Sequence, residues 1–151
     1  MCVEAPGAPF LDPCKWSASP TATVPAGGTT NLTIALESGR FLNVRVNDPL
    51  QLLPVAQGSL LDFPHVIVGV VFGTGAFLPA DTVSIDAAGR DLSMPVRIGV
   101  PLEFWVFSRH VTLQDAGGAA VDNRGTAIPF QAVTSSDVAF TIRVSGPAAA
   151  E

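Results

Sequence analysis

The fold is decided by residues 29–47, TTNLTIALESGRFLNVRVN, because both halves of this stretch alternate between apolar and polar positions. In residues 29–37 and then in residues 40–47, every second position is apolar: Leu32, Ile34, Leu36, Leu42, Val44 and Val46. A period of two is typical of a β-strand with one buried face. Ser38 and Gly39 stand between the halves, and glycine accepts the backbone angles of a tight turn. The stretch therefore predicts a β-hairpin.

Short segments of the same kind, separated by turns rich in Gly, Asp and Asn, fill the rest of the chain. No window of about eleven residues has helical periodicity without a Gly or Pro inside it. Further strands are expected at residues 65–72, 82–86, 91–96, 102–107, 111–114, 126–131 and 138–144. About eight to ten short strands are typical of a sandwich or a barrel. Because an apolar stretch at residues 48–64 interrupts the series, we expect an all-β fold, a single antiparallel β-sandwich.

Length and composition predict one packed domain. The chain has 151 residues, of which 14% are charged, and a net charge of -5. The longest apolar run, residues 66–72, is far shorter than the ~20 residues of a membrane-spanning helix, so we expect no transmembrane segment. Scattered arginines and an acidic balance argue against nucleic acid as a partner. We divide the chain into a Pro-rich N-terminal arm (1–28), a β-sandwich domain (29–146) and a tail (147–151).

The N-terminal arm holds the two cysteines of the chain, Cys2 and Cys14. A disulfide between them would close a short loop and contribute on the order of 3 kcal/mol. Alternatively, Cys2 is the lipid-bearing first residue of a bacterial lipoprotein. Both interpretations predict an exported protein, extracellular or in the cell envelope of a bacterium. Two unpaired thiols in a cytosolic protein are the remaining alternative.

Residues able to carry chemistry are few. The chain has two histidines, His65 and His110, one lysine, Lys15, and no tyrosine. Neither a Gly-x-Ser-x-Gly elbow nor a His-Glu-x-x-His pair is present, so we expect no enzyme and no catalytic residue. The cysteines and histidines are too widely spaced along the chain for a typical transition-metal site. We expect no metal or cofactor, and we expect the loop aspartates to form turns rather than to bind calcium.

Two segments carry a resemblance to a known family. Residues 24–49, VPAGGTTNLTIALESGRFLNVRVNDP, resemble the opening of the carboxypeptidase-regulatory-like and other prealbumin-like (Ig-like) β-sandwich domains of exported bacterial proteins. Residues 100–121, with LQDAGGAAV, resemble a strand, turn, strand unit of such modules. The chain departs from the family at residues 50–64, where an apolar loop replaces a short polar turn. The resemblance implies a non-catalytic role in stabilising, spacing, adhesion or assembly, and it assigns no functional residue.

Apolar side chains in loops point to an interface. Such side chains either cover the protein's own core or meet a partner. The interface candidates are Trp16, Leu52, Leu53, Leu60, Leu61, Phe63, Phe77 and Leu78. We therefore expect a non-enzymatic, self-assembling cell-surface or filament subunit, or a module of a surface protein. In this hypothesis the N-terminal arm, with Trp16 as its anchor, docks on a neighbouring subunit.

Two other functions remain open. A carbohydrate- or small-ligand-binding module would expose Trp16 or Trp105 so that a sugar ring can stack on the indole. Core packing is the competing interpretation of Trp105, and the one that we favour, because Trp105 lies in a segment with Phe104 and Phe107. A phage decoration protein would share every feature of the self-assembling subunit.

Overall fold

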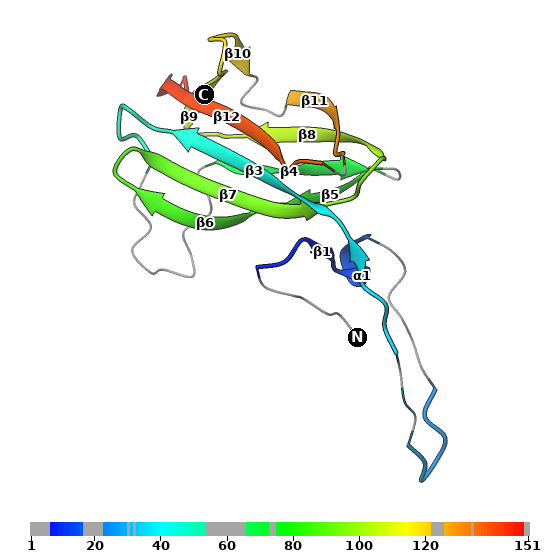
Figure 1. Cartoon of the computed structure of the whole chain (residues 1–151). Coiled ribbons are helices and arrows are strands. Elements are labelled where there is room, and N and C mark those ends of the chain that lie inside the picture. Colours follow the sequence, from blue (N-terminus) through cyan, green and yellow to red (C-terminus); the bar gives the residue numbers. More distant parts are fainter. Residues whose placement is uncertain are drawn as a thin grey trace.

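The computed structural model describes residues 7–16, 23–29, 31, 33–53, 66–72, 75–121, 126–133 and 135–149. This part of the chain is all-β, with 12 strands and one short helix (Figure 1). The elements are β1 (Phe10–Leu11), α1 (Pro13–Trp16), β2 (Glu37–Ser38), β3 (Arg40–Asn47), β4 (Ile67–Phe72), β5 (Ala76–Pro79), β6 (Asp81–Asp86), β7 (Gly89–Val96), β8 (Pro101–Phe107), β9 (Val111–Asp115), β10 (Ala120–Val121), β11 (Thr126–Gln131) and β12 (Val138–Pro147).

The strands form three sheets, in contrast to the single sandwich of about eight to ten strands that the sequence predicted. One sheet has six strands in the order β10-β9-β12-β3-β7-β6, one has four in the order β11-β8-β4-β5, and β1 and β2 form a small third sheet. All pairs of these strands are antiparallel except β12 and β3, which are parallel. Parallel neighbours need a long connection. Here the connection comprises every strand between β3 and β12.

The hairpin predicted for residues 29–47 is wrong. Residues 33–36 belong to no strand, β2 pairs with β1, and β3 pairs with β7 and β12. Gly39 forms no turn but allows a close approach, since a side chain there would meet the Val96 carbonyl oxygen and the Leu11 side chain. The alternation correctly placed Leu42, Val44 and Val46 in the core. It could not say which strand β3 pairs with, because alternation specifies a buried face and not a partner.

Other strand predictions are confirmed. The β6–β7 hairpin forms as expected, with Gly89 at a positive φ of 149°. β4 lies inside the four-stranded sheet, between β8 and β5. Residues 102–107 are apolar on both sides of the strand except at Glu103, so alternation could not choose the inward side; in β8 the structure buries Leu102, Phe104 and Val106. Trp105 therefore lies on the outward side of the sheet, and the favoured prediction that it packs in the core is wrong.

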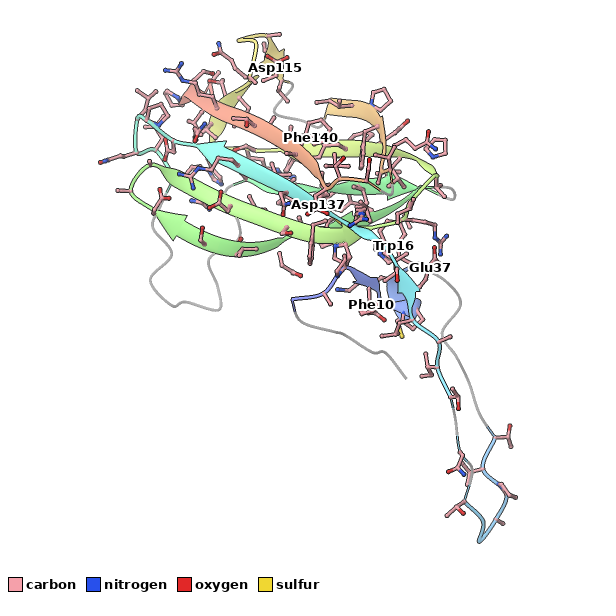
Figure 2. The ribbon with its side chains drawn as sticks, in the orientation of Figure 1. Phe10, Trp16, Glu37, Asp115, Asp137 and Phe140 are labelled. Atoms are coloured by element: carbon pink, nitrogen blue, oxygen red, sulfur yellow. The ribbon has the colours of Figure 1, made fainter. Side chains whose placement is uncertain are left out.

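The core lies between the six-stranded and the four-stranded sheet. Phe140 on β12 stacks on Phe104 of β8 with ring centroids 4.4 Å apart, and its edge meets Phe130 of β11 at 5.7 Å (Figure 2). These three rings join the two sheets directly. The buried residues around them are mostly valine and leucine, whose branched side chains pack well on pleated surfaces.

The free edges of both sheets carry features that discourage pairing with other strands. β5 and β6 are one run of chain that passes from one sheet to the other at Ala80, whose N–H donates to the Val68 carbonyl at 2.8 Å. β6 has an irregular register beside Val83, and β10 has only 2 residues. β11 carries Pro129 and β5 carries Pro79. Proline, bulges and short length are recognised ways of protecting a sheet edge.

Part of the N-terminal arm packs on the domain itself. Asp12 begins α1 as its N-cap, with its carboxylate accepting the Cys14 N–H at 2.9 Å and with Pro13 in the first turn. Leu11 and Trp16 are buried in the core, at 2% and 4% exposure. The boundary expected at residue 28 therefore does not separate an arm from a domain: residues 10–16 belong to the packed unit.

A second part of the N-terminal region points away from the sheets. We call the described residues 23–29, 31 and 33–36 the protruding arm (Figure 1). Its tip is a turn in which the Gly28 N–H donates to the Pro25 carbonyl at 2.9 Å, with Gly27 at a φ of 74°. Val24 is 59% exposed. Within the described residues, no helix is long and apolar enough to span a membrane.

Gly69 offers a test of how closely β4 and β5 approach. A methyl group at Gly69 would collide with the Leu78 carbonyl oxygen and with the Phe77 ring. Since overfilling costs ~1–3 kcal/mol, we expect Gly69→Ala to lower the free energy of unfolding by about 2 kcal/mol, measured by urea denaturation. Gly117→Ala, in an exposed turn where the methyl would meet only the Asp115 carboxylate, is the control. Equal stability of the two variants would contradict the packing described for β4 and β5.

Candidate functional site

The outer face of the six-stranded sheet is polar. At its centre, Arg45 on β3 forms ion pairs with Asp86 at 3.0 Å and with Asp91 at 3.2 Å. Ser84 donates to the same Asp91 carboxylate at 2.6 Å, and Ser93 donates to Asn43 at 2.8 Å. Such a network is typical of a solvated surface. This face therefore offers no candidate interface.

Asp86 has two functions in this network. The Arg45 guanidinium donates to its carboxylate, and the Ala88 N–H donates to it at 2.7 Å. The hydrogen bond from Arg45 is the main reason why the pKa of Asp86 lies below its usual value of 3.8. The bond to Ala88 closes the β6–β7 turn, as expected of a loop aspartate that forms a turn.

The outward side of the four-stranded sheet is different, because it is largely apolar. Strand register places one set of side chains opposite the buried set, and we call this set the outer face: Ile67, Val71, Phe77, Trp105, Phe107 and Pro129. Phe77 is 42% exposed, Pro129 is exposed, and the other four are half-buried. Among the described elements, none packs as a further layer on this face. Large exposed apolar patches are typical of interaction sites, so the outer face is the candidate interface.

Aromatic side chains dominate the centre of the outer face. Gly69 lies opposite Trp105 in the sheet, and the Phe77 ring lies over the space that a side chain at Gly69 would fill. The Trp105 indole N–H donates to Glu103 at 3.3 Å. At the far end of β8, the Arg109 guanidinium lies 5.8 Å from the centre of the Phe107 ring. The face thus has an aromatic centre, an acidic group on one side and a basic group on the other.

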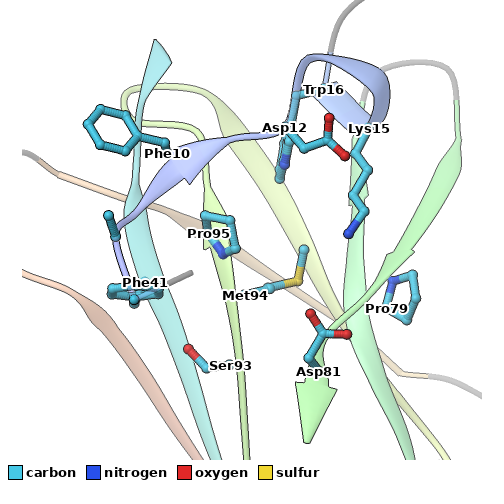
Figure 3. Close-up of a pocket in the computed structure, with 12 residues that line it drawn as sticks. Phe10, Asp12, Lys15, Trp16, Phe41, Pro79, Asp81, Ser93, Met94 and Pro95 are labelled. Atoms are coloured by element: carbon cyan, nitrogen blue, oxygen red, sulfur yellow. The ribbon is translucent and has the colours of Figure 1, made fainter. Parts of the chain in front are cut away.

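A pocket lies where the N-terminal segment meets the sheets (Figure 3). Its volume is about 250 Å³, slightly below the ~300–1,000 Å³ of typical ligand sites. The apolar part of its wall includes Phe10, Trp16, Phe41 and Met94. Lys15 extends into it between Asp12 and Asp81 (Figure 3). Because the Asp12 carboxylate caps α1, this pocket serves at least in part to seat the N-terminal segment.

Two buried polar side chains of the described residues, Ser108 and Asp48, bind backbone groups of nearby loops. The Ser108 hydroxyl, 1% exposed, accepts the backbone N–H groups of His110 and Val111, both at 3.2 Å. The buried Asp48 carboxylate accepts the N–H groups of Leu52 and Leu53, at 3.1 and 2.7 Å. Within the described residues, no three His, Cys, Asp or Glu side chains gather as a metal site would require. His65 lies outside the described residues.

The interface candidates from the sequence fall into three groups. Phe77 lies on the outer face, and Leu52, 39% exposed, lies in the loop after β3. Trp16 and Leu53 are buried in the core, and Leu78 packs against it, so these three are corrected from interface to core residues. In particular, Trp16 is held by its own chain and is not exposed for a neighbour or a sugar. Outside the described residues lie Leu60, Leu61, Phe63 and Cys2.

The disulfide between Cys2 and Cys14 stays a prediction, because Cys2 is outside the described residues. No cysteine of the described part is free.

Most of the outer face was not predicted from the sequence. Of its six residues, Phe77 was the one named as an interface candidate. One signal was available: residues 102–107 are apolar or aromatic on both sides of the strand, apart from Glu103. In a protein of two facing sheets only one side of each strand meets the core, so a strand that is apolar on both sides has an exposed apolar face.

Comparisons of the chain with family models, with curated proteins and with solved structures give no match.

The pKa of Asp86 gives a test of the polar face. A carboxylate whose pKa is lowered on folding stabilises the protein above its unfolded pKa, and this stabilisation is lost as the pH falls through the lower, folded value. We expect Asp86→Asn to unfold at lower urea than the wild type at neutral pH, with a difference that shrinks as the pH falls below 3.8. Asp115→Asn, in the β9–β10 turn, is the control. A difference that does not depend on pH would contradict the ion pair.

Proposed function

We propose that this protein is a non-enzymatic, exported structural protein that self-associates through the outer face, as a cell-surface or filament subunit or as a module of a surface protein. The observation that carries the proposal is the contrast between the two large sheets. The solvent side of the six-stranded sheet carries an ion-pair network around Arg45, whereas the outer face of the four-stranded sheet is apolar and aromatic around Trp105. A β-sandwich of Ig-like or prealbumin-like type would expose such a face only if a partner covers it.

The partner that we propose is a second copy of this chain. A two-fold interface is self-complementary, so each group meets the partner's copy of another group. Glu103 and Arg109 lie on opposite sides of the outer face. A two-fold axis that passes near Trp105, at the centre of this face, therefore brings Glu103 of one copy toward Arg109 of the other copy. Four strands ~4.8 Å apart give a face roughly 15–20 Å wide, at the lower end of what a specific interface needs, so the association depends on concentration.

Export is proposed on separate grounds. The two cysteines near the N-terminus and the resemblance of residues 24–49 to domains of exported bacterial proteins support it. A phage decoration protein would use the same outer face, so the mode of association and the biological source are separate questions.

Carbohydrate binding is the second candidate function, because Trp105 is half-buried on an outward-facing sheet. Against it, the neighbours of Trp105 on the outer face offer few hydrogen-bonding groups, and Glu103 already accepts the indole N–H. Trp16 is buried, so quenching of tryptophan fluorescence by a glycan would report on Trp105. We expect no quenching across a glycan panel. Saturable quenching that Trp105→Phe abolishes would move the function to glycan binding.

Val71→Lys tests the association directly. Val71 lies opposite Glu103 in the sheet, so a lysine there has a cross-strand partner within its own chain while it places a charge in the apolar face. We expect the wild type to exceed 15.6 kDa in light scattering and the Val71→Lys protein to have a lower mass at the same concentration. Ala139→Lys, exposed on the six-stranded sheet, is the matched control and keeps the wild-type mass. A wild type of 15.6 kDa at high concentration would overturn the proposal.

A further inference from the structure

Residues 33–36 have a strand sequence, but they pair with no strand of the described part of the chain. These residues, Thr33 to Leu36, belong to the alternating stretch 29–37 that predicted a strand. Threonine and isoleucine also favour strands. Among the described residues, no backbone hydrogen bond joins them to another element. Sequence and structure therefore disagree here, and such disagreements mark functional segments.

The base of this segment is held firmly. Directly after it, Glu37 and Ser38 form β2 and pair with Leu11 and Phe10 of β1. Arg97 binds the Glu37 carboxylate with two nitrogen atoms, at 3.0 and 3.1 Å, and donates to the Trp16 carbonyl at 3.1 Å. Its guanidinium also lies 5.8 Å from the centre of the Trp16 ring. Residues 33–36 of the protruding arm are thus anchored at their C-terminal end, through β2 (Figures 1 and 2).

The protruding arm has no charge that would oppose pairing. No Asp, Glu, Lys or Arg occurs from residue 17 to residue 36, although the whole chain has a net charge of -5. Charged side chains are a common protection of an unpaired strand. Like charges placed opposite each other destabilise a strand pair. Beyond residue 36 the strand continues into β2, whose one charged residue, Glu37, is bound by Arg97 of its own chain.

The sheet edges of this domain are poor acceptors for the segment. β5 and β11 contain proline, β6 is irregular beside Val83, and β10 is short. β2 also has only 2 residues, but it contains no proline and its pairing with β1 has no register shift. It is continuous with residues 33–36, and β1 pairs with one of its two edges.

We propose that residues 33–38 pair in antiparallel fashion with the same residues of a second copy of this chain. The small sheet then becomes four-stranded, in the order β1-β2-β2-β1 across the two copies. A two-stranded ribbon is marginal in water, whereas a larger sheet with an apolar face is stable. Ile34 and Leu36, both half-buried, supply that face.

This contact is separate from the outer face, although it deepens the proposed self-association. A subunit with one two-fold contact forms dimers. A subunit with two different two-fold contacts assembles beyond the dimer, into a closed dihedral oligomer when the two axes meet at a closing angle and into an open chain otherwise. The assembly is therefore larger than a dimer, and outer-face contacts and β2 contacts alternate in it.

The test uses a pair of proline variants, Ile34→Pro and Ala35→Pro. Successive N–H groups of a strand point to opposite edges, so one of the two prolines removes an N–H that faces the partner, and the other acts as its matched control. Both positions lie in the protruding arm, outside the core, so thermal unfolding is expected at the wild-type temperature. Each variant is made in the Val71→Lys protein, in which the outer face is blocked, and the mass is measured by light scattering.

We expect the Val71→Lys protein to be a dimer, one proline variant of it to be a 15.6 kDa monomer, and the other to stay dimeric. Dimers in both proline variants overturn the strand pairing. A Val71→Lys protein that is already monomeric overturns it too, and leaves the outer-face proposal standing if the wild type is larger. A Val71→Lys protein with the wild-type mass overturns the outer-face proposal instead, and the same two prolines in the wild-type chain then decide the strand pairing.

Discussion

The parallel pairing of β3 with β12 is the contact on which the rest of the structure depends. It places the first and the last long strand side by side in the middle of the six-stranded sheet. β12 also brings Phe140 onto Phe104, so the same strand completes one sheet and packs it on the other. Because β3 and β12 are far apart in sequence, neither the sheet nor the core is complete until most of the chain is in place. A fold with contacts of this range is expected to form slowly and as one cooperative unit.

The two sheets divide the surface into regions of different character. Arg45 and its two aspartates give the six-stranded sheet a water-compatible outside, whereas Trp105 and its neighbours give the four-stranded sheet an outside that resembles a core. At the same time, proline, an irregular register and short length protect the sheet edges. Edge protection alone would suit a monomer, but a monomer gains nothing from an apolar face exposed to water. The division supports the proposed association through a face, and the protected edges disfavour pairing at the edges of the two large sheets, which do not include β2.

The sequence predicted faces better than it predicted partners. A period of two correctly gave the inward residues of β3, and turn residues gave the β6–β7 hairpin, because both depend on local chemistry. The hairpin at residues 29–47 failed because β3 finds its partners far away in the chain. The core position favoured for Trp105 failed for a related reason: two apolar sides of one strand look alike until a second sheet covers one of them. The burial of Trp16 could not be predicted either, because its neighbours are distant in sequence: Arg97 donates to its carbonyl and also binds Glu37.

Arg97 connects the packing of the N-terminal segment to the protruding arm. One guanidinium group binds the carbonyl of Trp16, lies beside its ring and grips Glu37 with two hydrogen bonds. The bidentate geometry fixes direction as well as distance, since the planar guanidinium matches the planar carboxylate. The residue that ends α1 and the residue that begins β2 are therefore oriented by the same side chain. If residues 33–36 met a partner without this anchor, the whole arm would have to be ordered on binding. With the base already fixed, only the few residues beyond it lose conformational freedom, and a short strand can pair with useful affinity.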